Sequence, residues 1–151
     1  MNRRGIFKVL ATVAAAVSFT GRGAAAASEK PHRLALHVDQ NDAEVMKLAF
    51  NNARNASKLY KERGEDIAVE IVTYSQGLHM LRDDTSPVKR EIAELRKEIP
   101  NLVLSGCNNT KVGMEKREGK SVPIIAEARI VPAGIVRLME LQEEGYAYVK
   151  P

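Results

Sequence analysis

The sequence predicts a single α/β domain, a three-layer α/β/α fold around a mainly parallel sheet of about five strands. Strand-like apolar segments alternate with stretches of helical spacing between residues 33 and 149. Such alternation favours right-handed crossovers and parallel strands. The chain has 151 residues, 44% of them hydrophobic, which fits one folded domain with a modest core and excludes a disordered chain.

The first half of the domain is predicted to hold two strands with one long helix between them. Residues 33–39 alternate apolar with small or polar side chains, as a strand does. Asn41 or Asp42 can cap the helix that follows, and Gly64 is suited to end it. Residues 67–74 are β-branched and apolar and form the strongest strand signal.

Shorter elements continue the alternation in the second half. A turn is predicted at residues 75–77, a short helix at 78–81, a helix at 86–99 and a buried strand at 102–106. A polar helix at 111–117, a weak strand at 128–131, a helix at 135–142 and a last strand at 146–149 are predicted to follow. Pro87 suits the first turn of its helix, and Pro100 ends that helix.

Ligand sites of parallel α/β sheets lie beyond the carboxyl ends of the strands. Four short segments are expected there: residues 39–41, 75–77, 107–110 and 132–134. We therefore expect the functional residues among them.

Residues 1–27 have the features of a secretory signal peptide. A basic start precedes an apolar stretch at 9–19, and the small residues 24–27 offer cleavage near Ala27. The pair Arg3–Arg4 resembles the twin-arginine export signal. The apolar run is shorter than a membrane span, so we expect a periplasmic protein, residues 28–151, with no stable membrane insertion. An uncleaved anchor is the alternative.

The net charge of +4 belongs to this leader. The chain has 23 Lys and Arg against 19 Asp and Glu. Four of the basic residues lie in residues 1–27, which contain no acidic residue, so the remaining 19 balance the 19 acidic ones. A formally neutral mature chain does not indicate nucleic-acid binding.

Cys107 is the candidate catalytic residue. It follows a predicted strand and precedes a predicted helix, with Asn108 or Asn109 as the expected cap. A helix amino terminus favours a thiolate, which can take up sulfane sulfur as a persulfide. The alternative is that Cys107 is a small buried hydrophobe. A single cysteine excludes an internal disulfide and a cysteine-rich zinc site.

Further side chains are expected to form the pocket around Cys107 and to stabilise its thiolate: Asn108, Asn109, Thr110, Ser75, Gln76, Gly77 and His79. His79 is a candidate acid–base group or proton-sharing partner of Cys107, with a packing role in the loop as the alternative. His37, inside the first strand, is expected to be structural. His32 and His37 would face opposite sides of that strand, so neither a metal nor another cofactor is expected.

Five segments carry a resemblance to a known family: residues 34–38 (LALHV), 72–81 (VTYSQGLHML), 106–110 (GCNNT), 131–135 (VPAGI) and 141–148 (LQEEGYAY). Together they resemble the DsrE/DsrF-like sulfur-relay proteins over nearly the whole mature chain. The resemblance implies a three-layer subunit that assembles into homotrimers or homohexamers. It also implies that Cys107 matches the cysteine that carries persulfide sulfur. Those relay complexes act in the cytoplasm, whereas this chain has an export signal.

The leading hypothesis for function is therefore a periplasmic sulfur carrier or sulfurtransferase that passes a persulfide from Cys107 to the thiol of a partner protein. The alternative is a non-catalytic homo-oligomer that binds a small ligand and in which Cys107 is structural.

Overall fold

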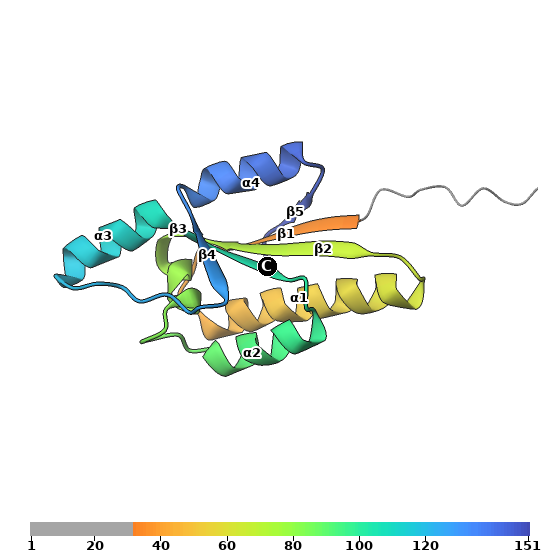
Figure 1. Ribbon diagram of the computed structural model, residues 1–151, viewed down its shortest axis with the longest axis horizontal. Helices are drawn as coiled ribbons and strands as arrows, with labels where there is room; N and C mark the ends of the chain where they lie inside the picture. The colour runs from red at the N-terminus through yellow and green to blue at the C-terminus, as the bar shows by residue number, and fades with distance from the viewer. Residues whose placement is uncertain (1–31) are drawn as a thin grey trace, which may run out of the picture.

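The structure, a computed structural model, describes residues 32–151 and arranges them in three layers (Figure 1). Its centre is a five-stranded sheet in the order β4-β3-β2-β1-β5. The strands are β1 (His32–Val38), β2 (Ile67–Thr73), β3 (Val103–Cys107), β4 (Ala128–Val131) and β5 (Ala147–Val149). All four pairings are parallel. The predicted three-layer α/β/α fold is confirmed.

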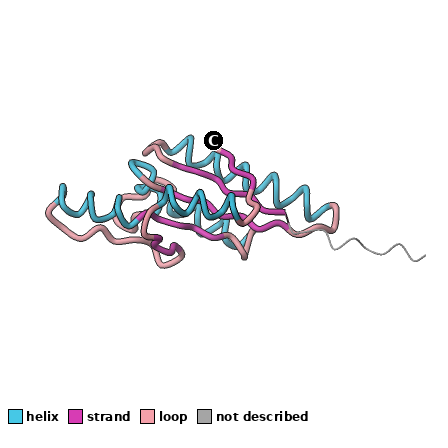
Figure 2. Tube along the Cα trace, turned by 90° about the horizontal axis from the view of Figure 1, so that it is seen from above, coloured by secondary structure: helices cyan, strands magenta, loops and turns pink. Residues whose placement is uncertain are grey.

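Helices cover both faces of the sheet and extend past one end of it. They are α1 (Ala43–Glu62), the 3-10 helix η1 (Ser75–Leu81), α2 (Lys89–Glu98), α3 (Asn108–Glu118) and α4 (Gly134–Glu143). α1 and α2 lie against one face and α4 lies alone on the other, while α3 extends beyond the end of β3 (Figure 1). The view from above shows the strands side by side with the helices along them (Figure 2).

The predicted signal peptide, residues 1–27, lies outside the described residues. Within residues 32–151, no helix has the length and apolar character needed to cross a membrane.

The start of α1 shows how the sequence sets a helix boundary. Of the two predicted caps, Asp42 is the one used, because its Oδ1 accepts hydrogen bonds from the backbone N–H groups of Glu44 (2.8 Å) and Val45 (3.4 Å). The chain leaves α1 through Gly64, whose φ of 73° is the left-handed conformation that glycine adopts readily.

Two helix starts differ from the sequence-based expectation. α2 begins at Lys89 and not at Ser86–Pro87, because the Ser86 hydroxyl donates to the Met80 carbonyl (2.6 Å) and accepts from the Val88 N–H (3.3 Å), which forms a separate turn. α3 begins at Asn108 without a preceding loop, so its N-cap is Cys107 and neither Asn108 nor Asn109.

The two faces of the sheet are buried to different degrees. On the α1 and α2 side, seventeen buried residues form one apolar cluster that includes Leu36, Phe50, Ile71 and Leu95. On the α4 side, the buried apolar cluster consists of four residues, Ala35, Val72, Leu138 and Leu141. Apolar burial therefore anchors α1 and α2 strongly, and polar contacts take a larger part in placing α4.

Gly77 lets η1 cross the end of β1. A Cβ atom at this position would lie 2.1 Å from the carbonyl oxygen of Val38 and 2.5 Å from its carbonyl carbon. Because both neighbours are backbone atoms, a larger residue requires the loop after β2 to move.

We predict that Gly77→Ala lowers the free energy of unfolding by at least about 2 kcal/mol, since the overlap strains the main chain. Urea denaturation measures this. Gly113→Ala, inside α3, is the matched control: its Cβ would meet only the Arg117 side chain, at 3.6 Å, so the added methyl group should stabilise the helix by up to about 1 kcal/mol. Equal midpoints for the two variants would contradict the prediction.

Candidate functional site

Cys107 lies where two helices start. It is the last residue of β3 and the N-cap of α3, and it pairs in register with Val131, the last residue of β4. Gly134, the first residue of α4, packs so closely that a Cβ there would lie 3.2 Å from that of Cys107. The residue is buried, with 5% of its surface exposed. The amino-terminal ends of α3 and α4 thus meet at the sulfur.

Two opposing effects set the acidity of the thiol. Burial raises the pKa of Cys107. Nearby hydrogen-bond donors act in the opposite direction: the Thr110 hydroxyl and the backbone N–H groups of Gly134, Thr110 and Asn109 lower the pKa of Cys107. These donors prevail, so the pKa of Cys107 lies below its ordinary value. This environment stabilises a thiolate and is open to nucleophilic chemistry.

Thr110 connects the sulfur to the loop after β2. Its hydroxyl accepts a hydrogen bond from the Ser75 N–H at 3.0 Å, and the same hydroxyl lowers the pKa of Cys107. Ser75 has a φ of 51°, a left-handed conformation that costs a non-glycine residue roughly 1 kcal/mol or more. The structure therefore brings the predicted residues Ser75, Thr110 and Cys107 together.

The other predicted residues contribute in different ways. Asn109 acts through its main chain, and its N–H also faces the Pro132 carbonyl oxygen at 3.3 Å. Asn108 and Gln76 are exposed. Gly77 shapes the loop and is buried. The side chains of Asn108 and Gln76 therefore face solvent.

His79 lies in a separate polar network. Its Nδ1 is 3.4 Å from the Thr85 hydroxyl, and burial together with the charge of Arg82 lowers the pKa of His79. Arg82 is itself buried and is paired with Asp84 and Glu118. Within the described part of the chain, no hydrogen bond joins His79 to Cys107, so the expected proton-sharing contact is not formed in this structure.

A second cluster of titratable groups adjoins Tyr74, and of its members the sequence-based prediction placed Asp39, in residues 39–41, near the site. The His37 ring stacks on Tyr74 with centroids 4.5 Å apart, and its Nδ1 lies 2.9 Å from the Tyr148 hydroxyl. Lys150 donates to Asp39 Oδ2 at 2.7 Å. Tyr74 in turn lies against Gly134, whose Cβ would be 3.0 Å from Tyr74 Cδ1. The cluster forms the wall of the Cys107 site on the β1 side.

Burial controls the protonation of this wall. Burial lowers the pKa of His37 and outweighs the raising effect of the Asp39 carboxylate, which favours the neutral ring. Burial also raises the pKa of Tyr74, and the Asp39 charge adds to that effect. His37 Nε2 and Asp39 Oδ1 are buried without a hydrogen-bond partner among residues 32–151. The sequence signal that could have revealed this cluster is the alternation of side chains along β1, which places His37 and Asp39 on one face.

The site does not have the composition of a metal centre. Across residues 32–151, no three His, Cys, Asp or Glu side chains are grouped so that they could hold a metal ion. His32 pairs with Glu65 at 2.7 Å and stacks on Tyr60, far along β1 from His37. The groups that face the Cys107 sulfur are hydrogen-bond donors, which suit an anion and not a cation.

Comparison with known proteins supports the class of fold. The chain is similar to a solved structure from Methanobacterium thermoautotrophicum, MTH1491, which is described as a protein of unknown function. The two share 26% sequence identity over 80% of this chain and 99% of that chain, with a TM-score of 0.67. No protein-family model and no curated protein matches the chain. The resemblance to the DsrE/DsrF-like family stays a prediction.

We predict that Thr110→Val raises the pKa of Cys107 by about 1 to 2 pH units, because a hydrogen bond to a charged group contributes about 1.5–3 kcal/mol. The rate of alkylation by iodoacetamide, followed against pH, reports the thiolate, and its midpoint should move to higher pH. Thr85→Val removes a hydroxyl that contacts His79 and should leave the midpoint unchanged. An unshifted midpoint in Thr110→Val would show that the hydroxyl does not act on the sulfur.

Tyr148→Phe is expected to lower the free energy of unfolding by about 1–3 kcal/mol, since it leaves the buried His37 Nδ1 without a partner. Urea denaturation again gives the measurement. Tyr146→Phe is the control, because within residues 32–151 the Tyr146 ring contacts Arg33 and its hydroxyl forms no hydrogen bond. A loss of equal size in both variants would assign the effect to the edge strand and not to His37.

Proposed function

We propose that the protein is a sulfur carrier that holds sulfane sulfur as a persulfide on Cys107 and passes it to a partner thiol. The observation that supports this most strongly is the set of hydrogen-bond donors at the sulfur, which lowers the pKa of a buried thiol. A structural cysteine in an apolar core has no need of such donors, and burial alone would raise its pKa.

The transfer that we propose is balanced between two sulfur compounds. The Cys107 thiolate attacks the sulfane sulfur of a persulfide R–S–SH and forms a new S–S bond. The S–S bond of the sulfur donor breaks, and its electron pair leaves with R–S⁻, which takes up the proton. The donor thiol sulfur is reduced and the Cys107 sulfur is oxidised, so no further oxidant is required.

The same hydrogen-bond donors suit the product. A cysteine persulfide is also an anion near neutral pH, with negative charge on its outer sulfur. Because the sulfur lies where α3 and α4 begin, its charge interacts favourably with the amino-terminal ends of both helices. Burial of Cys107 limits contact with unrelated thiols and oxidants, which favours a carrier that releases sulfur to a docked partner.

Location and assembly are part of the proposal. Residues 1–27 would direct the chain to the periplasm. If Arg3–Arg4 act as a twin-arginine signal, the chain would be exported as a folded protein. Exposed apolar side chains on α4, at Ile135, Val136 and Met139, support a surface for assembly into the homotrimer or homohexamer that the family resemblance implies.

The burial of Cys107 supports the second candidate, a non-catalytic homo-oligomer that binds a small ligand. With 5% of its surface exposed, the residue could act as a packing side chain. The two candidates differ in the reactivity of the folded protein towards sulfur donors.

Intact-mass analysis after exposure to polysulfide is the direct test. We expect one adduct of about 32 Da, one sulfur atom, on the wild-type protein, removed by dithiothreitol, and none on Cys107→Ala. Cys107 is the single cysteine of the chain, so any adduct on the variant measures nonspecific addition. Equal adducts on both proteins, or none on the wild type, would reject the carrier and favour the ligand-binding protein.

A further inference from the structure

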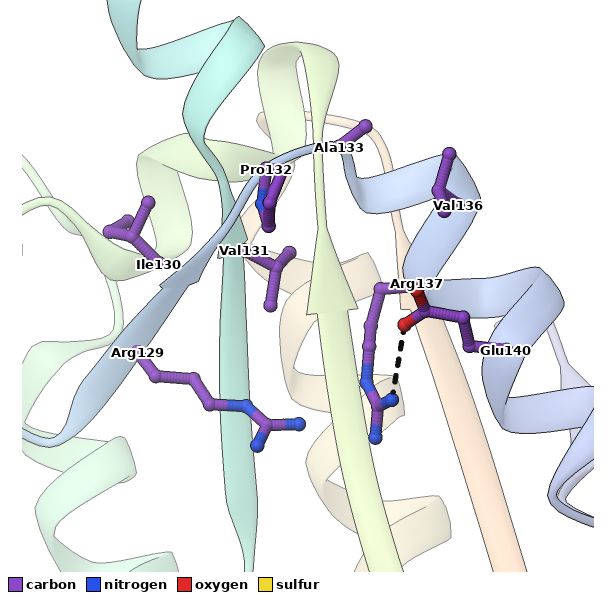
Figure 3. A pocket seen from close by; sticks show the side chains of 8 residues that line it. All are labelled: Arg129, Ile130, Val131, Pro132, Ala133, Val136, Arg137 and Glu140. Carbon is purple, nitrogen blue, oxygen red and sulfur yellow. Dashed lines mark hydrogen bonds and ion pairs between the residues drawn. The ribbon is translucent and has the colours of Figure 1, made fainter.

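A groove lies between β4 and α4 (Figure 3). Its volume is about 300 Å³, at the lower end for small-molecule sites. The end wall is residues 131–133. Val131 pairs in register with Cys107, and the next residue after this wall, Gly134, lies so close that a Cβ there would be 3.2 Å from that of Cys107. The segment that closes the groove is therefore the one that wraps the candidate nucleophile.

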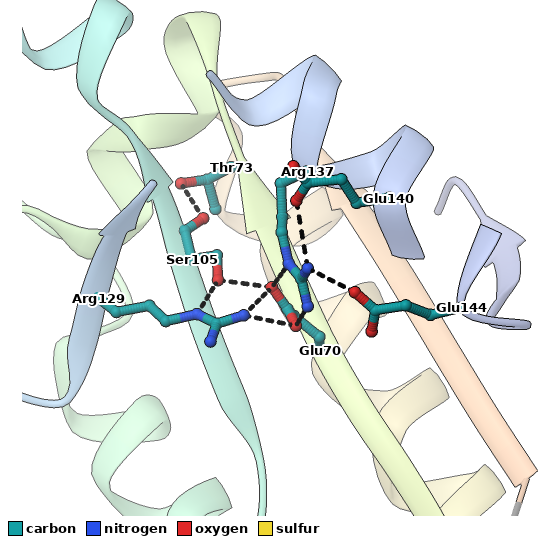
Figure 4. Close-up of polar contacts among 7 residues, drawn as sticks. All are labelled: Glu70, Thr73, Ser105, Arg129, Arg137, Glu140 and Glu144. Atoms are coloured by element: carbon teal, nitrogen blue, oxygen red, sulfur yellow. Dashed lines mark hydrogen bonds and ion pairs between the residues drawn. The ribbon is translucent and has the colours of Figure 1, made fainter. Parts of the chain in front are cut away.

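Two guanidinium groups form the floor of the groove and share one buried carboxylate (Figure 4). Glu70, on β2, has a side chain that is 2% exposed. Arg129 Nη2 lies 2.8 and 2.9 Å from its two oxygens, and Arg137 contacts both oxygens at 3.0 and 2.9 Å. Burial raises the pKa of Glu70, but the hydrogen bonds from Arg137, Ser105 and Arg129 prevail and hold it below its ordinary value. Glu70 is therefore ionised and fully engaged.

The two arginines differ in what remains for a ligand. Arg137 uses its remaining nitrogen, Nη1, on Glu140 (3.3 Å) and Glu144 (2.9 Å). Arg129 donates from Nε to the Ser105 hydroxyl at 2.9 Å, and its Nη1 has no hydrogen-bond partner within residues 32–151. The Arg129 side chain is 50% exposed. Its guanidinium reaches into the groove from β4, opposite Arg137 (Figure 3).

Charge and shape together favour an anionic group at Arg129. One carboxylate, Glu70, is shared by two guanidinium groups, and Glu140 lies beyond Arg137 on the far side of the groove (Figure 3). Glu140 and Glu144 both pair with Arg137, so Nη1 of Arg129 is the guanidinium nitrogen that remains for an anion within residues 32–151. The rest of the lining includes Ile130, Val131 and Val136, which are apolar. The groove thus matches a small molecule with a carboxylate at one end and an apolar, polarisable end near Cys107.

We propose that this groove binds the sulfur donor, and that the sulfur donor is a small carboxylate-bearing persulfide, with Arg129 Nη1 holding its carboxylate and its sulfane sulfur presented to Cys107. This inference rests on the proposed sulfur-carrier function. The transfer is the one written above: the Cys107 thiolate bonds to the sulfane sulfur, and the carboxylate-bearing thiolate leaves with the electron pair and takes up the proton.

The test compares two persulfides that differ in one group, those of 3-mercaptopropionate and 3-mercaptopropionamide. Intact-mass analysis follows the rate of the gain of about 32 Da on Cys107. We expect the wild-type protein to load about tenfold faster from the carboxylate, as a charge-assisted hydrogen bond predicts. Arg129→Met should reduce the carboxylate rate to about that of the amide. Arg90→Met, in an exposed position on α2, should keep the wild-type preference.

Arg129→Lys separates charge from geometry and provides a second variant should Arg129→Met not fold. It keeps a positive charge and loses the planar fork, so an intermediate preference is expected. Equal wild-type rates for the two persulfides, or an undiminished preference in both Arg129 variants, would overturn the groove as the site of the sulfur donor while leaving the carrier function intact.

A binding measurement keeps the two proposals distinguishable. Cys107→Ser cannot take up sulfur, so calorimetric titration with 3-(methylthio)propionate reports the groove alone. We expect binding that is lost with the matching amide and in Cys107→Ser with Arg129→Met. If this binding occurs while the wild-type protein gains no sulfur, the carrier function is rejected and the groove stands as a carboxylate site. If neither occurs, both proposals are overturned.

Discussion

The buried carboxylate of Glu70 is the interaction on which the second face of the sheet depends. That face has few buried apolar side chains, so apolar burial alone places α4 weakly. Glu70 binds one arginine from the edge strand, Arg129, and one from the helix, Arg137. A buried ion pair adds little net stability compared with apolar residues, but separating its partners is costly. Its effect is therefore to fix where β4 ends and where α4 begins, and those two points enclose Cys107.

The chemistry of the site follows from this placement. The start of α4 is held against the end of β3, and this brings the Gly134 N–H near enough to Cys107 to lower its pKa. On the other side of Cys107, Thr110 ties the loop at Ser75 to the start of α3. Residues 131–133 bound the groove between β4 and α4, and Arg129 and Arg137, which line it, both bind the carboxylate of Glu70. One cluster of charges thus supports both the environment of the sulfur and the space beside it.

The elements of this fold were predictable because their signals are local, whereas the site depends on distant pairs. The apolar pattern of residues 67–74 and the junction at Cys107 can be recognised within a few residues of sequence. Glu70 could be recognised as a charged residue inside that apolar pattern. Its partners Arg129 and Arg137 lie 59 and 67 residues away along the chain, so the pairing could not be recognised. His37 and Tyr148 are 111 residues apart, so the pairing has no local signature. The cap of α3 was misassigned because asparagine is a common N-cap and cysteine is not.

The groups that lower the pKa of Cys107 are one hydroxyl and three backbone N–H groups, with no cation among them. Lys111, the basic residue nearest along the chain, pairs with Glu115 on its own helix. Dissolved ions screen the attraction between separated formal charges, and they act far less on short contacts inside a buried site. The thiolate fraction of Cys107 is therefore set by the Thr110 hydroxyl and by backbone donors, and it should vary little with ionic strength. A thiol whose pKa is lowered in this way keeps its acidity in dilute and in concentrated salt alike.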